Sequence, residues 1–137
     1  MTGSALNQPC FFPHDMTSLF DPVRLGDIEL PNRIVMAPSV GAWPAQCRVP
    51  DDGMRAFYAQ RADAGLILAG AASVSPLGVG HPDMPGIWNS TQAQGWRSVT
   101  DAVHRRGGRI VLQLWHAGRV SDPEYLLGEM PVAPSAI

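Results

Sequence analysis

The chain has 137 residues, which is enough for one domain. Hydrophobic residues make up 45% and charged residues 16%. This composition supports a packed core and excludes a chain that is disordered as a whole. The formal net charge of -2 comes without a basic run, so neither nucleic acid nor an anionic membrane surface is expected as a partner. The apolar runs are too short to cross a bilayer, and the first residues lack the pattern of a secretory signal.

The cysteines and histidines do not form a metal-binding pattern. Cys10 and Cys47 are isolated from each other and from the histidines, so we expect reduced thiols in a cytoplasmic protein and no metal site. His104 precedes two arginines on a predicted helix and is expected to be solvated. His116 follows a predicted strand and is expected to be packed and hydrogen-bonded.

The N-terminal part of the chain changes character near residue 18. Residues 1–17 show no periodicity and are expected to form a flexible extension. Short alternating segments flank a Gly26-Asp27 turn within residues 19–30, which predicts a β-hairpin. The apolar run over residues 33–38 is typical of a parallel strand that is buried on both faces.

A helix and a second strand are predicted next. Asp51 is a suitable N-cap, and apolar residues follow at helical spacing to about Ala64. Gly65 is expected to end this helix. The apolar run over residues 66–72 then predicts a buried strand.

A second helix and a third strand complete the predicted pattern. Asn89 is the expected N-cap, with Gln92 placed to reach back in a capping box. Gly107 and Gly108 are expected to stop the helix, and residues 109–114 predict another apolar strand. The remaining residues are expected to be irregular.

Strands that alternate with helices predict a parallel sheet with right-handed crossovers. Two helices cannot cover both faces of so apolar a sheet, and the last strand would be left as an open edge. A complete (β/α)₈ barrel needs about 250 residues. The sequence therefore predicts an incomplete layer architecture whose missing part is supplied from elsewhere.

Several common catalytic patterns are absent from the sequence. The turn after the first predicted strand lacks a G-x-G-x-x-G, and there is no Walker lysine motif, no G-x-S-x-G and no H-E-x-x-H. These absences disfavour Rossmann, P-loop, α/β-hydrolase and zinc-protease functions.

Gln113 is a polar amide within an otherwise apolar strand. A buried amide needs hydrogen-bond partners, so it either bonds to neighbouring backbone or belongs to a site. It lies near the carboxyl end of its strand, where barrel enzymes carry their chemistry. Its amide can donate and accept at once, which matches a ring edge with alternating N–H and C=O groups.

Seven blocks of sequence resemble the N-terminal third of the Old Yellow Enzyme family of FMN-dependent ene-reductases. The resemblance covers about residues 18–137, with the blocks in the family's order and spacing. The blocks are LFDP (19–22), LPNRIVMAP (30–38), YAQRA (58–62), PGIW (85–88), GWRSVTDAVH (95–104), LQLWHAGR (112–119) and PVAPSAI (131–137).

The resemblance implies an α/β fold: the N-terminal βαβαβ portion of a TIM (β/α)₈ barrel with a preceding β-hairpin, incomplete without a partner chain. Residues 18–137 would form the first three βα units of an FMN-binding barrel. Family members reduce activated C=C bonds, such as those of α,β-unsaturated carbonyl compounds, with FMN as cofactor and NAD(P)H as reductant.

The resemblance also assigns expected site residues. In the family, the loop after the first strand, a backbone group of the second strand and a glutamine of the third contact the flavin. The corresponding residues here are Ala37, Pro38, Ser39, Val40, Ala71 and Gln113. The expected substrate-pocket residues are His81 and Trp115.

The sequence departs from the family pattern at four places in or beside these segments. Val40 stands where the family usually has Thr or Cys, and Gly70 stands where it usually has Glu. His81 replaces a pocket tyrosine of many members, and Gly41-Ala42 stand where an arginine often follows the first-strand loop. These changes bear on the redox potential of a bound flavin and on the geometry of a bound substrate.

The family's substrate-holding pair and its proton-donating tyrosine correspond to positions beyond residue 137, so we expect the catalytic residues on a partner chain. Three hypotheses remain open: a subunit of a split enzyme that acts by reduction or redox-neutral isomerisation, a non-catalytic structural or regulatory subunit, and a truncated reductase. A second copy of this chain would not supply the missing pair, so a different chain is the expected partner.

Overall fold

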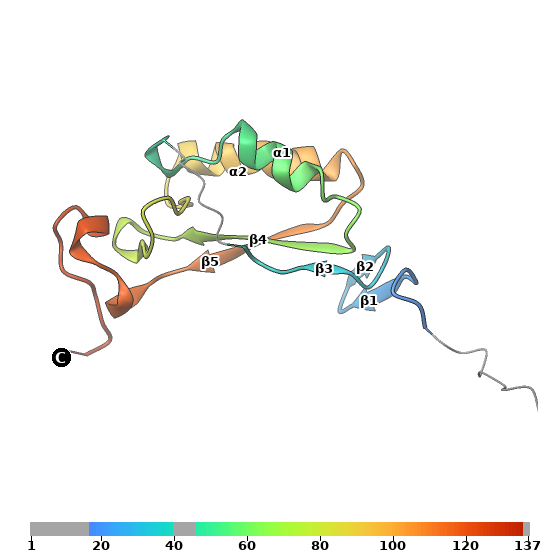
Figure 1. Ribbon diagram of the computed structural model, residues 1–137, viewed down its shortest axis with the longest axis horizontal. Helices are drawn as coiled ribbons and strands as arrows, with labels where there is room; N and C mark the ends of the chain where they lie inside the picture. The colour runs from blue at the N-terminus through green and yellow to red at the C-terminus, as the bar shows by residue number, and fades with distance from the viewer. Residues whose placement is uncertain (1–16, 40–45, 136–137) are drawn as a thin grey trace, which may run out of the picture.

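The computed structural model describes residues 17–39 and 46–135, which form two small sheets, two α-helices and several 3₁₀ turns (Figure 1). A two-stranded antiparallel sheet pairs β1 (Val23–Leu25) with β2 (Ile28–Leu30). Gly26 lies in the turn between them with φ +59°, a left-handed conformation that suits glycine. The predicted hairpin is confirmed.

The main sheet is parallel, with the strand order β3-β4-β5. Its strands are β3 (Val35–Met36), β4 (Leu66–Ser73) and β5 (Ile110–Trp115). The parallel sheet and its chain order are as predicted. The first strand is much shorter than the predicted residues 33–38, because only Val35 and Met36 have ladder partners, Leu66 and Ile67.

Helix α1 (Asp52–Ala59) begins at the predicted N-cap, where the Asp51 side chain accepts a hydrogen bond from Met54 N at 2.8 Å. It ends at Ala59, five residues before the predicted Ala64. The segment that follows closes into tight turns with the hydrogen bonds Arg61 N to Tyr58 O and Ala64 N to Arg61 O. The predicted helix end was therefore wrong.

Gly65 does not serve as a helix end of the left-handed kind. A Cβ at this position would lie 2.1 Å from the backbone oxygen of Asn32, so glycine is required for close approach. Asn32 ties this turn to the start of β3. Its Oδ1 accepts from Gly65 N at 2.8 Å and from Ile34 N at 3.1 Å, and its Nδ2 donates to Asp63 O at 2.9 Å.

Helix α2 (Ser90–His104) has the predicted cap, with Asn89 Oδ1 accepting from Gln92 N at 2.9 Å. Gln92 reaches back to Trp88 N at 2.9 Å, one residue beyond the expected capping-box partner. The helix stops as predicted, since Gly107 has φ +78° and Gly108 N bonds to Val103 O at 3.1 Å.

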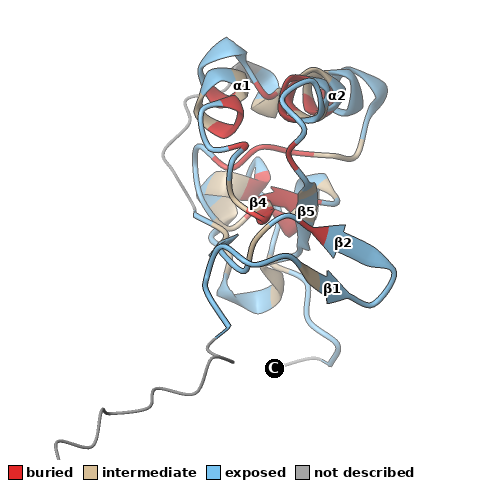
Figure 2. Cartoon of the chain, turned by 90° about the vertical axis from the view of Figure 1, so that its right-hand side faces the viewer, coloured by how far each residue is buried: buried red, intermediate tan, exposed pale blue. Residues whose placement is uncertain are grey.

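The core lies between the two helices and one face of the sheet (Figure 2). Met54 and Tyr58 of α1 and Trp96, Val99 and Val103 of α2 pack on the sheet. Their sheet partners are the buried Ile67, Ala69 and Ala72 of β4, with Met36, Ile110 and Leu112 half-buried around them. Because both helices lie on the same side (Figure 1), no α-helix among the described residues covers the opposite face of the sheet.

The strand predicted over residues 33–38 is not buried on both faces, whereas β4 is buried along nearly its whole length and β5 forms the open edge that was predicted. On the edge strands, Val35 is 48% exposed and Val111 is 45% exposed. The residues after β5 are more regular than predicted, because they form the 3₁₀ turns η3 (Gly118–Val120) and η4 (Pro123–Leu126). Two further 3₁₀ turns, η1 (Gln46–Arg48) and η2 (Pro76–Gly78), lie in the loops before α1 and after β4.

Candidate functional site

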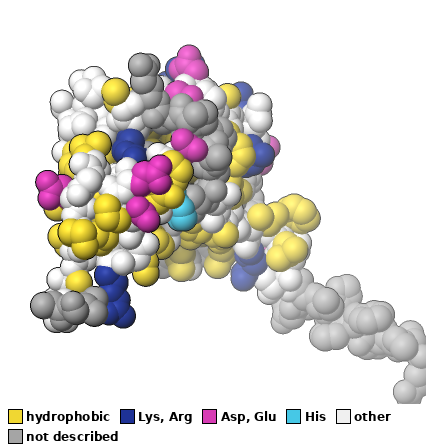
Figure 3. All heavy atoms as spheres, turned by 60° about the vertical axis from the view of Figure 1, so that its left-hand side comes forward, with side chains coloured by type: hydrophobic (Ala, Val, Ile, Leu, Met, Phe, Trp, Pro, Cys, Tyr) yellow, Lys and Arg dark blue, Asp and Glu magenta, His cyan; other side chains and the backbone are white. Residues whose placement is uncertain are grey.

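The carboxyl ends of β4 and β5 bring together several of the predicted site residues. Ile110 and Leu112 pack against the helices, so the alternation along β5 directs Val111, Gln113 and Trp115 to the uncovered face. On the side of the molecule that carries these strand ends, hydrophobic side chains gather along the lower part, below the helices (Figure 3).

Gln113 is exposed, which corrects the expectation of a buried amide. The reason is its place on β5, an edge strand, on the face that no α-helix of the described residues covers. There the Gln113 side chain makes no hydrogen bond, so both its donor and its acceptor remain available. The amide that the sequence singled out is therefore free to bind a ligand on this face.

The backbone of β4 approaches Gln113 closely at Gly70. A Cβ on Gly70 would lie 3.1 Å from Gln113 O and 3.5 Å from Gln113 Cβ. Gly70 also has φ +115°, a conformation that L side chains rarely adopt. This position therefore favours glycine, where the family usually has glutamate.

The pairing of β4 with β5 is irregular at the same point. Ala69 pairs with Leu112 and Ala72 pairs with Leu114, so Gly70 and Ala71 of β4 face Gln113 alone. This is a bulge, and bulges re-aim backbone groups near functional sites. Ala71 is buried, and its backbone lies next to Gly70 at the point where β4 meets Gln113.

Residues Ala37, Pro38 and Ser39 follow β3 at the same end of the sheet. Met36 pairs with Ile67, so a continued register would bring Ser39 level with Gly70. Ala37 and Ser39 are exposed and Pro38 is half-buried. Val40 lies outside the described residues.

His81 and Trp115 come from different segments that lie side by side. Trp115 is 38% exposed, and its Nε1 lies 3.6 Å from where a Cβ of Gly80 would stand. The Gly78 and Val79 carbonyls accept hydrogen bonds from Ala117 N at 2.9 Å and from the Ser121 hydroxyl. His81 is exposed next to this contact. The structure thus brings the His81 loop against the end of β5.

Two histidines outside the site match their expectations in different degrees. His104 is exposed at the end of α2, as expected. His116 is hydrogen-bonded as expected, because its Nδ1 accepts from Gly118 N at 3.1 Å. Its ring lies against Gly78, where an added Cβ would come within 2.9 Å of Cδ2, but the residue as a whole is exposed.

Arg48 is an organising residue that the sequence did not indicate. Its Nη1 donates to the carbonyls of His81, Pro82 and Met84 at 3.3, 2.8 and 3.0 Å. Partial burial lowers the pKa of Arg48, while nearby Asp83 acts in the opposite direction. No sequence pattern signals this contact, because its partners are carbonyl groups more than thirty residues away.

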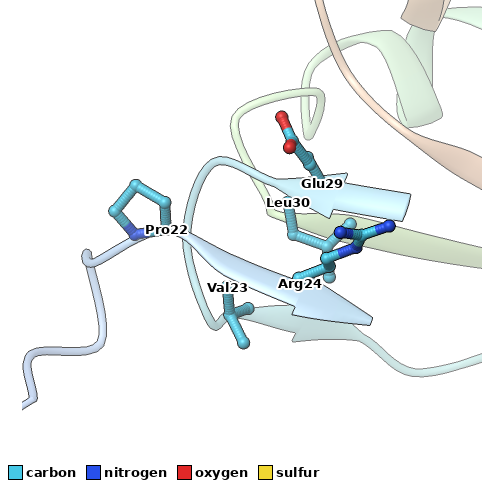
Figure 4. A pocket seen from close by; sticks show the side chains of 5 residues that line it. All are labelled: Pro22, Val23, Arg24, Glu29 and Leu30. Atoms are coloured by element: carbon cyan, nitrogen blue, oxygen red, sulfur yellow. The ribbon is translucent and has the colours of Figure 1, made fainter. Parts of the chain in front are cut away.

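A separate hollow of about 310 Å³ lies on the hairpin and is lined by Pro22, Val23, Arg24, Glu29 and Leu30 (Figure 4). The hairpin lies at the end of the sheet where the strands begin, away from the strand ends that carry Gln113 (Figure 1). The described residues contain no cluster of His, Cys, Asp and Glu that could hold a metal ion. No helix among them is long and apolar enough to span a membrane.

Comparison with known proteins places this arrangement among flavin enzymes. The chain is 44% identical over 129 residues to the flavin oxidoreductase hxnT of Emericella nidulans, covering 87% of this chain and 32% of the relative. It is 38% identical over 121 residues to 12-oxophytodienoate reductase 1 of Oryza sativa subsp. japonica, covering 84% of this chain and 30% of the relative.

Solved structures share the fold. Morphinone reductase in complex with tetrahydroNAD matches with a TM-score of 0.83 and 47% identity, covering 89% of this chain and 34% of that one. The Old Yellow Enzyme homologue from Zymomonas mobilis matches with a TM-score of 0.82 and 46% identity, covering 88% and 34%. The chain thus spans about a third of the length of these relatives, and its three strands are part of a TIM barrel.

The sequence profile of one family matches residues 18–137, which contain every described strand and helix. The matched residues include the strands that carry the free amide of Gln113 and the bulge at Gly70, and they form about a third of the barrel. The chain therefore belongs to the NADH:flavin oxidoreductase / NADH oxidase family.

Proposed function

We propose that residues 18–137 form the ring-contacting part of an FMN site in an Old Yellow Enzyme-like oxidoreductase. The reaction would be the reduction, or redox-neutral isomerisation, of an activated C=C bond in an α,β-unsaturated carbonyl compound. The observation that carries this proposal is the free amide of Gln113 on the sheet face away from the helices, on a residue whose backbone lies close to Gly70.

The donor set fits the ring portion of a flavin. The pyrimidine edge of isoalloxazine alternates N–H and C=O groups, and one carboxamide can pair with both kinds. Ala71 would add backbone contact from β4, and Ala37, Pro38, Ser39 and Val40 would approach from the loop after β3. When bound, the flavin supplies hydride transfer from NAD(P)H to the alkene.

The protein's own part would be to orient that ring and shape the pocket around the substrate. Trp115 would line the pocket from β5, and His81 would approach it from the loop that packs against β5. In barrel enzymes the phosphate commonly binds at loops after the seventh and eighth strands. The residues in hand therefore fit the ring of FMN, and the phosphate site would come from the rest of the barrel.

We further propose that a second, different protein chain supplies the remaining βα units. The uncovered face and the open edge of β5 support this, because parallel sheets are normally covered on both faces. That chain would carry the substrate-holding pair, the proton donor and the phosphate-binding groups. NAD(P)H would be the reductant, and the substrate would be a small molecule.

A second candidate is a non-catalytic subunit of the same fold. The conformation of Gly70 favours it, since φ +115° and the 3.1 Å approach of an added Cβ to Gln113 O would strain the glutamate that the family usually has there. In that case the three-strand layer would stabilise or regulate another barrel chain without binding flavin.

The deciding experiment is co-expression of this chain with the neighbouring open reading frame, followed by a visible spectrum of the purified complex. Flavin bands near one equivalent per complex would support the split flavoenzyme, and activated alkenes would then be screened as substrates. A stable but colourless complex that refuses added FMN would leave the non-catalytic subunit. A continuous reading frame for the rest of the barrel would show a truncated reductase.

Replacement of Gln113 tests the ring contact directly. We expect Gln113→Leu in the complex to raise the Kd for FMN about tenfold, because hydrogen bonds worth about 1–2 kcal/mol to the ring edge are lost. Gln94→Leu is a matched control, since Gln94 is an exposed glutamine on α2. Fluorescence quenching of FMN gives the Kd, and equal values for both variants would contradict the assignment.

A further inference from the structure

Tyr58 carries a hydroxyl that reaches from helix α1 into the middle of the sheet. The residue is 1% exposed, and its Oη accepts a hydrogen bond from Gly70 N at 3.1 Å. It packs on the helix side of β4, in the same cluster as Ile67 and Ala69. A buried hydroxyl aimed at a strand backbone is a polar contact inside an otherwise apolar layer.

The Gly70 N–H needs this partner because the strand ladder fails at Gly70. The β4–β5 pairing passes from Ala69–Leu112 directly to Ala72–Leu114, so two residues of β4 face one of β5. A buried N–H left without an acceptor at such a bulge costs about 1–3 kcal/mol. Burial also raises the pKa of Tyr58, so its hydroxyl stays protonated at neutral pH.

The same bulge sets the spacing between two of the expected flavin contacts. Gly70 lies close to Gln113, with 3.5 Å between the position of an added Cβ and Gln113 Cβ. Ala71 is the next residue along β4. Any shift of the Gly70 amide away from the helix therefore moves Ala71 relative to Gln113.

We infer that Tyr58 is a positioning residue for the flavin contact: its hydroxyl fixes the Gly70-Ala71 backbone and thereby the position of Ala71 relative to Gln113. The inference rests on the proposed function, since it needs a ring bound at that edge. Tyr58 itself contacts the helix side of the sheet and does not touch the ligand face.

The test is Tyr58→Phe in the complex of this chain with its barrel-completing partner. The substitution removes one oxygen and keeps the ring, and Tyr125→Phe is the matched control because Tyr125 is the chain's other tyrosine. We expect Tyr58→Phe to raise the Kd for FMN about tenfold, to shift the bound flavin's absorption maximum and midpoint potential, and to speed hydrogen exchange at the Gly70 and Gln113 amides. Tyr125→Phe should change none of these.

The outcomes separate the inference from the proposed function. If the wild-type complex binds FMN and Tyr58→Phe lowers only thermal stability, leaving Kd, spectrum and potential unchanged, Tyr58 is merely structural and the inference is overturned. If the wild-type complex refuses FMN, the proposed function fails and takes the inference with it. Should Tyr58→Phe not fold, 3-fluorotyrosine at position 58 keeps the hydroxyl while weakening it as an acceptor. It should still shift the Gly70 amide resonance and the flavin potential, and an unchanged potential would again overturn the inference.

Discussion

Three polar side chains satisfy backbone groups that the regular elements leave without partners. Asn32 bonds to the turn between α1 and β4, Tyr58 bonds to the bulge in β4, and Gln92 bonds to Trp88 N before α2. Gln92 also donates to Cys47 O at 3.4 Å. Because buried backbone groups are costly when unpaired, these side chains fix local geometry that apolar packing alone would leave free.

Asn32 offers a stability test at this scale. Asn32→Ala removes the acceptor of the buried Gly65 N–H and two further hydrogen bonds, so we expect a loss of about 2 kcal/mol in the free energy of unfolding. Urea denaturation of the complex measures it, with Gln94→Ala as an exposed control. Equal midpoints for the two variants would show that the turn does not depend on Asn32.

Tyr58 gives a pH test whose sign follows from its raised pKa. Burial raises the pKa above its ordinary value of 10.0, so the folded state holds the phenolic proton more tightly than the unfolded state. This contribution to stability is complete below about pH 10 and is lost as the pH rises through the folded-state pKa. The melting temperature should therefore fall more steeply between pH 8 and pH 11 for the wild type than for Tyr58→Phe. Parallel curves would contradict it.

At the scale of elements, the sequence predicts those features that depend on short-range patterns. Both N-caps, Asp51 and Asn89, are correct because a capping side chain bonds within its own first turn. The end of α1 is missed because Asn32, far away in the sequence, holds Asp63 and Gly65 in a turn. The bulge at Gly70 is missed for the same reason, since it exists only in the pairing with β5.

The candidate site was predictable to a similar extent. Gln113 stood out because one amide interrupts an apolar strand, and the family resemblance supplied the other positions. The exposure of Gln113 and Trp115 was not predictable in this way, because it depends on which other strands pack against that face of β5. The role of Arg48 could not be predicted, because an arginine that donates to backbone carbonyls has no recognisable sequence pattern.

Arg48 yields a prediction for the loop that carries His81. Arg48→Met keeps an apolar stem but leaves the His81, Pro82 and Met84 carbonyls without their charged donor. Bonds to charged groups are worth about 1.5–3 kcal/mol, so we expect faster amide exchange across residues 78–86 and a lower melting temperature. Arg97→Met, on the exposed face of α2, is the control. Unchanged exchange in the loop would show that Arg48 does not hold it.

At the scale of the whole molecule, the α-helices cover the sheet from one side only. The helices bury their apolar faces against β4, while Val35, Val111 and Leu114 on the edge strands are 48%, 45% and 63% exposed. An edge strand with exposed apolar residues readily pairs with another strand. We therefore expect this layer to depend on further βα units for its stability.

A charge on the uncovered face tests that dependence. Val111→Arg places a cation where the completed barrel would have its packed interior, and an unpaired buried charge is strongly destabilising. We expect the variant to lose its partner in co-purification, whereas Val120→Arg, at a 79% exposed position on η3, should keep it. Equal recovery of the partner with both variants would place the contact elsewhere.

Because the α-helices cover the sheet from one side only, the stability of this layer can depend on protein concentration. Chains that complete one another's core obey mass action, so the melting temperature rises with the concentration of both. Strands that follow on the same polypeptide are always present at a fixed effective concentration, and dilution then leaves the melting temperature unchanged. A dilution series of melting curves therefore reports whether the residues that cover Val35 and Val111 belong to a separate chain or to the same polypeptide.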